Sequence, residues 1–173
     1  MKRFACLAVA FALAATTNAH AASATARASA TIFKPMTITA SAQMSFGKLQ
    51  YNAGSGPAMT TVVLSAQAPI TRTSPDAQLL SGGGETPAIR NVTGQANAVY
   101  RVTISNTTST PGGLLVDAFK IWSTNGGDIS SSHLGMLNGA GTDTIRIGAT
   151  LHVPVKTKND VYTAMPTILI SYE

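Results

Sequence analysis

Cysteine is nearly absent from this sequence of 173 residues. The one cysteine, Cys6, lies in an apolar run close to the N-terminus. If that run is removed during export, the remaining chain contains no thiol and cannot form a disulfide bond. A chain of about 150 residues can bury a sufficient hydrophobic core, so we expect one domain that is stable without covalent cross-links.

Charged residues are also scarce, at 11% of the sequence, and the formal net charge is +5. Lys2 and Arg3 carry two of these charges, so a chain without its N-terminal run has a net charge of +3. The other basic residues are scattered rather than clustered. Nucleic-acid binding needs basic residues on one face, so we expect no nucleic-acid partner. The abundance of Thr, Ser, Ala and Gly is typical of exported β-proteins.

No apolar run is long enough to span a bilayer, and the mature chain is expected to have no membrane span. The longest run, from Phe4 to Ala15, follows two basic residues and precedes the small-x-small sequence Ala19-His20-Ala21. These features in this order are typical of a secretory signal peptide. We therefore expect cleavage of residues 1–21, and a location in the periplasm, at the cell surface or outside the cell.

No helical period of useful length follows this leader. Short runs that alternate apolar and polar residues are separated by turn-rich segments, which indicates strands. The runs 88–94 and 99–105 are predicted to form a hairpin because a short connection joins them. The longest alternation, 145–155, is predicted to bend into two strands at Gly148.

A last strand is predicted over 162–172, with an irregularity at Pro166 because proline cannot donate a ladder hydrogen bond. Another strand is predicted over 115–122, but its apolar residues fall on both faces, so its orientation stays open. Short strands at this spacing favour an all-β fold. We expect a single antiparallel β-sandwich of immunoglobulin-like, Greek-key type over residues 34–173.

The residues from Ala22 to Phe33 alternate small apolar with polar side chains until Lys34-Pro35 ends the pattern. In a strand these side chains would point to opposite faces. A lone strand is not stable in water, so this segment needs a sheet edge in its own molecule or in another. We predict that residues 22–33 are an N-terminal extension or a first strand. The candidate donor-strand face consists of Ala22, Ala24, Ala26, Ala28, Ala30 and Ile32.

Residues that could act in catalysis, metal binding or sugar binding are few. His133 and His152 are interpreted as exposed residues, because no constellation of nucleophile and base accompanies them. The segment Asn125–Asp128 is interpreted as a turn rather than a calcium loop, since the regular acidic spacing is missing. Trp122 is interpreted as a core or rim residue rather than a sugar-stacking one. We expect no catalytic residue, no metal and no cofactor, and an exported hydrolase is the least favoured function.

Several short segments occur in a definite order. The opening and middle contain 24–39, Met44–Gly47, Val92–Gly94 and Ala98–Tyr100, and the closing half contains Leu137–Ile145, Gly148–Leu151 and Tyr162–Tyr172. In order and spacing they resemble a family of bacterial exported β-sandwich domains of unknown function. That family is similar to the pilus (fimbrial) subunits that a chaperone and an usher assemble.

This resemblance implies a pilin-like fold that lacks its last strand, with a groove filled by the N-terminal extension of a neighbouring subunit. Carried over to this chain, residues 22–32 match the donating extension, and Tyr172 matches the near-terminal tyrosine of pilin ends. The implied partners are other copies or related subunits and a periplasmic assembly chaperone.

Two functions therefore stand open. The first is a non-catalytic structural or adhesion subunit of a surface fibre, joined to its neighbour by β-strand complementation. The alternative is a monomeric sandwich that pairs residues 22–32 with its own sheet and binds a carbohydrate or another surface partner. They differ in the sheet edge with which the alternating segment pairs.

Overall fold

The computed structural model describes residues 23–51, 59–105, 113–154 and 157–173. The predicted signal peptide, 1–21, and Ala22 lie outside this part. The chain divides into two units, residues 1–31 and 32–173. In the first unit the described residues, 23–31, form no strand and are all exposed. The alternating segment thus has the strand pattern but not the strand, as expected where no sheet edge pairs with it.

Within the described ranges every regular element is a β-strand, and every strand pair is antiparallel. The larger sheet has seven strands. They are β1 (Thr37–Ala42), β3 (Met59–Leu64), β4 (Arg72–Thr73), β6 (Ala88–Thr93), β8 (Leu115–Ser123), β9 (Gly127–Asp128) and β11 (Thr142–Pro154).

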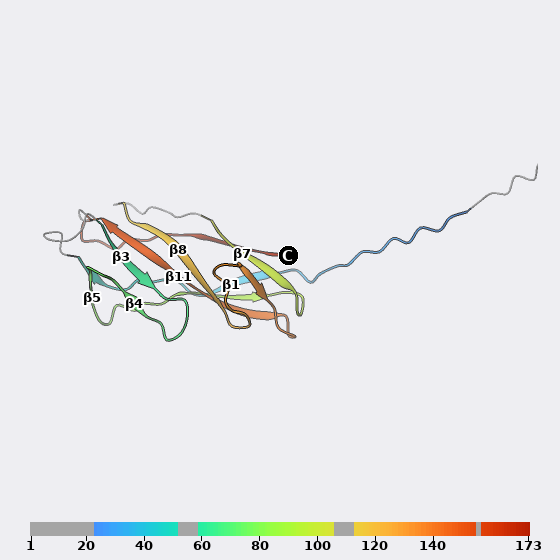
Figure 1. The fold of residues 1–173 in the computed structure, drawn as a ribbon, viewed down its shortest axis with the longest axis horizontal. Helices are drawn as coiled ribbons and strands as arrows, with labels where there is room; N and C mark the ends of the chain where they lie inside the picture. Colours follow the sequence, from blue (N-terminus) through green and yellow to red (C-terminus); the bar gives the residue numbers. More distant parts are fainter. Residues whose placement is uncertain (1–22, 52–58, 106–112, 155–156) are drawn as a thin grey trace, which may run out of the picture. The chain divides into compact units, whose positions relative to one another are not determined.

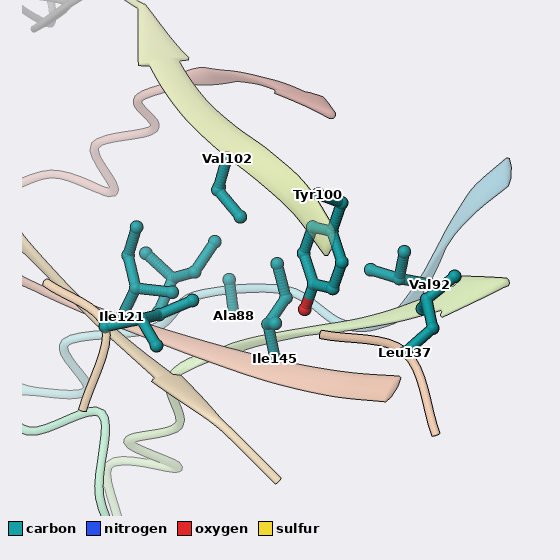
Figure 2. Packing of buried hydrophobic residues seen from close by; sticks show 9 residues of the cluster. Ala88, Val92, Tyr100, Val102, Ile121, Leu137 and Ile145 are labelled. Atoms are coloured by element: carbon teal, nitrogen blue, oxygen red, sulfur yellow. The ribbon is translucent and has the colours of Figure 1, made fainter. Parts of the chain in front are cut away.

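A smaller sheet has three strands, with β7 in the middle. They are β10 (Leu134–Met136), β7 (Val99–Ser105) and β12 (Thr167–Tyr172), and a separate short pair consists of β2 (Leu49–Gln50) and β5 (Gln78–Leu79). The two main sheets enclose a core. Figure 2 shows Tyr100 and Val102 pointing from β7 toward Ala88 and Ile145 of the larger sheet. The predicted antiparallel β-sandwich is confirmed.

β11 is the central strand of the larger sheet, beside β8 in Figure 1. The prediction of two strands divided at Gly148 is wrong, because β11 continues over 13 residues. β8 pairs with both of its halves and holds them in one line. On the other edge the partner of β11 changes at Gly148, because its pairing with β6 ends at Ile147 and its pairing with β3 begins at Ala149. The glycine marks a change of partner rather than a bend.

The orientation left open for residues 115–122 is explained by a β-bulge in β8. Ala118 and Phe119 lie opposite the single residue Ala149, and Ala118 has a φ of 47°. The extra residue shifts the alternation, so that Val116 and Ile121 both face the core although they are five positions apart.

The predicted hairpin of 88–94 and 99–105 is also wrong, because β6 and β7 belong to different sheets. The connection between them bonds instead to the loop before β11, with Gly94 N donating to Gly141 O at 2.9 Å. Val92 on β6 and Tyr100 on β7 are both completely buried. Because the two side chains face each other from opposite sheets, both are covered by the core. If β6 and β7 were neighbours in one sheet, the two side chains would only lie side by side on its surface.

The last strand is shorter than predicted. β12 begins at Thr167, directly after Pro166, and residues 157–166 form no strand. Proline has no backbone N–H to offer to a ladder, which agrees with a strand that starts beyond it. The predicted alternation nevertheless holds through the whole segment, since Tyr162, Ala164, Ile168 and Ile170 are all half-buried between exposed neighbours.

Candidate functional site

A groove with an apolar floor lies over the part of the larger sheet formed by β8 and β11. Its volume is about 1010 Å³, and its floor contains Leu114, Val116, Leu151 and Val153. These four buried side chains belong to one of the two hydrophobic clusters of the domain. Most of the remaining lining comes from residues 44–51, which follow β1, and residues 157–166, which precede β12.

The segment 161–166 has the side-chain pattern of a strand and borders this groove. Tyr162 and Ala164 pack against the cluster beneath the groove, while Val161 and Met165 are 90% and 80% exposed. The Tyr162 hydroxyl donates to Lys158 O at 2.8 Å, which ties the segment to the preceding turn. Among the described residues this alternating segment has no strand partner, so the groove leaves room beside it for a further strand.

β12 continues this segment and is an edge strand in the described part of the chain, where it pairs with β7 alone. The bond from Glu173 N to Val99 O, at 3.2 Å, shows which residues of β12 direct their backbone groups toward β7. In an antiparallel ladder alternate residues bond to the same neighbour. The backbone groups of Ile168 and Ile170 therefore point to the open edge, while their side chains contact the core.

β1 has a similar open edge, since among the described residues it pairs with β6 alone. Ile38 of β1 is half-buried and packs against the same core cluster as Ile168 and Ile170. β1 runs toward the groove and β12 runs away from it. The domain is thus incompletely covered along the side where these two edge strands and the groove lie.

Tyr172, which the resemblance singled out, ends β12 and contacts the base of the N-terminal extension. Its hydroxyl donates to Lys34 O and accepts from Gln95 N at 2.8 Å. The rings of Phe33 and Tyr172 have centroids 5.0 Å apart. Sequence reasoning named Tyr172 but not its three partners, because they come from distant segments.

The candidate donor face is described from Ala24 onward, while Ala22 lies outside the described residues. Ala24, Ala26, Ala28 and Ala30 are exposed and in no strand. Ile32, in the second unit, is 91% exposed. The role of this face as a donated strand stays a prediction.

The residues considered for chemistry are placed apart. His133 is exposed and lines a small cavity of about 280 Å³ beside Phe119. His152 is half-buried rather than exposed, because its Nε2 lies 2.8 Å from Asp117 Oδ1 on the neighbouring strand β8. Sequence reasoning missed this pair, because Asp117 and His152 are brought together only by the register between β8 and β11. Trp122 is half-buried near the end of β8.

The segment Asn125–Asp128 is used as a turn. The Asn125 side-chain amide donates to Met136 O at 3.0 Å and to Thr142 O at 2.9 Å, which ties the turn to the end of β10 and the start of β11. Asp128 Oδ1 accepts from Ser130 N at 2.9 Å. In the part of the chain that is described, no three His, Cys, Asp or Glu residues gather as a metal-binding group. No helix in that part could cross a membrane.

A buried polar cluster escaped sequence reasoning altogether. Asp143 Oδ2 accepts hydrogen bonds of 2.6 Å from the hydroxyls of Tyr100 and Ser123, and its Oδ1 accepts one of 2.7 Å from Thr144 N. Burial, followed by the hydrogen bond to Asp143, raises the pKa of the Tyr100 hydroxyl, so it stays a donor. These bonds satisfy a buried carboxylate and join β7, β8 and β11.

Residues 36–172 match a family model described as "Domain of unknown function (DUF4402)". No curated protein and no solved structure matches the chain significantly.

Proposed function

The chain belongs to the DUF4402 family of domains of unknown function, and from that premise we propose that it is a non-catalytic, exported subunit of a fimbria-like surface fibre. In this proposal each subunit donates residues 22–32 to a neighbour and accepts the same segment of another neighbour. The groove beside residues 157–166, at the start of the open edge of β12, is the observation that carries the proposal.

A strand added along β12 would bond to the backbone groups of Ile168 and Ile170 that point to the open edge. Where such a strand continues past Pro166 along residues 161–166, its alternate side chains would lie over the floor of the groove, because strand side chains alternate between two faces. Main-chain bonds supply affinity in this mode of recognition, and side-chain pockets supply specificity. Both requirements have a counterpart in the groove and its edge.

The N-terminal segment of a second copy has the features of such an occupant. Its period of two places every second residue from Ala24 to Ile32 on one face and the hydroxyls of Ser and Thr on the other. Ile32 is 91% exposed, and its complete burial would contribute about 1.5–3 kcal/mol. Alanine contributes little by burial, so the backbone pairing must carry much of the affinity.

The two ends of the domain suit a head-to-tail arrangement. The extension starts beside Tyr172, where β12 ends, whereas the groove lies beside residues 157–166, where β12 has not yet begun. The six residues of β12 separate these places by about 20 Å at the strand rise of about 3.3 Å per residue. A periplasmic chaperone that covers the groove before assembly is the partner that such an open edge requires.

The test compares two charge substitutions in the full-length chain, exported from bacterial cells. Ala28→Asp places a carboxylate on the face that enters the groove, where burying it would cost several kcal/mol. Ser29→Asp places the same charge on the opposite face. We expect boiling-resistant ladders of surface extract from the parent and from S29D, and only monomer from A28D.

Only monomer from well-expressed parent protein would contradict the fibre and favour the self-paired monomer that binds a carbohydrate or another surface partner. Equal ladders from A28D and S29D would show that the alanine face does not enter the groove.

A further inference from the structure

Tyr172 joins three segments that are far apart in the sequence. Its hydroxyl donates to Lys34 O, at the base of the extension, and accepts from Gln95 N, in the connection between β6 and β7, at 2.8 Å. Its ring lies against Phe33, with centroids 5.0 Å apart. The end of β12 thereby holds the point at which the extension leaves the domain.

Gly94 shows that space is reserved for this side chain. A Cβ atom at Gly94 would lie 2.5 Å from the Tyr172 hydroxyl oxygen and 3.0 Å from Leu137 Cδ1. Real Cβ atoms do not approach so closely, so any larger residue at position 94 would displace the tyrosine. Ring contact, two hydrogen bonds and the missing Cβ together define one position for Tyr172.

We propose that Tyr172 is a positioning residue that directs the extension away from the groove of its own domain and toward a neighbouring copy. The inference rests on the proposed function, because it concerns the same groove. It assigns Tyr172 a role in the choice between polymer and self-paired monomer.

Entry into the chain's own groove requires a reversal at residues 33–36, so that the extension runs back along β12. Pro35 disfavours a reversal centred on Lys34, since the residue before a proline is restricted to extended conformations. Tyr172 holds Lys34, the residue before this proline, through its carbonyl oxygen. The structure has no turn over residues 32–36. The hydrogen bond from Tyr172 and the proline therefore both favour an extended backbone at Lys34.

The two modes of insertion predict opposite strand directions. The chain's own extension would run parallel to β12, with Phe33 near Tyr172 and residues close to Ala24 near Ala164. A neighbour's extension would enter from the end near Val161 and run antiparallel to β12, with Ala30 near Ala164. The end near Tyr172 is closed to a neighbour because the chain's own Phe33 and Lys34 occupy it.

Paired cysteines in the full-length exported chain distinguish these modes, because the mature sequence contains no cysteine of its own. Ala30→Cys with Ala164→Cys reports insertion from a neighbour as disulfide-linked ladders on a non-reducing gel. Ala24→Cys with Ala164→Cys reports self-insertion as a monomer with an internal disulfide. Each pair is combined with Tyr172→Phe, which keeps the ring but removes the hydroxyl. Glu173→Gln is the control, because Glu173 is adjacent to Tyr172 but binds Arg101.

We expect the chain with Tyr172 to form interchain disulfides through position 30. In Y172F the ratio of interchain to intrachain product should fall roughly tenfold, as expected for the loss of one to two net hydrogen bonds. E173Q should leave the ratio unchanged. A merely structural role would lower both products together as the domain unfolds.

An unchanged ratio in Y172F would overturn the positioning role while leaving the fibre intact. Intrachain product in the chain with Tyr172, without interchain product, would overturn it as well and support the self-paired monomer. If neither cysteine pair forms a disulfide in any variant, the groove is not the acceptor, and the proposed function and the role of Tyr172 fail together.

Discussion

Gly148 has almost no free space around its α-carbon. A Cβ atom at this position would lie 2.2 Å from Leu64 O and 2.7 Å from Ala66 N. Both atoms belong to the backbone that leaves β3, so they cannot move aside as the end of a flexible side chain could. The glycine allows β3 to approach β11 where β6 ends.

Gly148→Ala is therefore expected to lower the free energy of unfolding by about 1–3 kcal/mol, the usual cost of overpacking. Gly139→Ala is the matched control, because a Cβ atom there would meet nothing within 4 Å. Urea denaturation of both variants measures the difference. Equal stability of the two would contradict the close approach at Gly148.

At the scale of elements, the segment 161–166 and β12 form one alternating run of which only β12 has a strand partner. Pro166 divides the run by its missing donor. Every second side chain is half-buried in both parts, so the unpaired half keeps the burial pattern of a strand. We interpret this half as the acceptor's border rather than as an irregular loop.

Ala164 and Met165 offer neighbouring positions on that border, the first half-buried toward the groove and the second 80% exposed and outside the groove lining. Ala164→Glu places a charge where a donated strand would lie, whereas Met165→Glu places it toward solvent. We expect A164E to abolish boiling-resistant ladders and M165E to retain them. Circular dichroism checks that both remain folded. Ladders from A164E would exclude this border as the acceptor.

At the scale of the whole molecule, the proposed donor at one end and acceptor at the other would make a heterologous contact, which passes from subunit to subunit and is not satisfied within one symmetric dimer. Each subunit would then carry a donor segment and a separate acceptor groove. A chain with a defective donor segment could still accept a neighbour's segment, and a chain with a defective groove could still donate its own.

A mixture of two defective chains tests this arrangement. A28D keeps an intact groove, and A164E keeps an intact donor segment. We expect each alone to remain monomeric and the mixture to form one species of twice the monomer mass, measured by size-exclusion chromatography with light scattering. Long polymers in the mixture, or no association at all, would contradict separate donor and acceptor ends.

The sequence by itself determined the fold class, because a period of two over short runs decides which side chains can be buried together. It also located the alternating extension, its end at Lys34-Pro35, and Tyr172. The predictions from sequence that failed concern which strands pair with each other. The hairpin of 88–94 with 99–105 and the division at Gly148 are both wrong because alternation names a buried face but not the strand that pairs with it.

Only the tertiary structure decided these partners. Val92 and Tyr100 face each other across two sheets because that arrangement buries both, and β8 keeps β11 continuous by pairing with both halves. The groove, the open edge of β12 and the contacts of Tyr172 with Phe33, Lys34 and Gln95 arise from segments far apart in the chain. Contacts between such segments depend on packing of the whole domain, which no local pattern of residues contains.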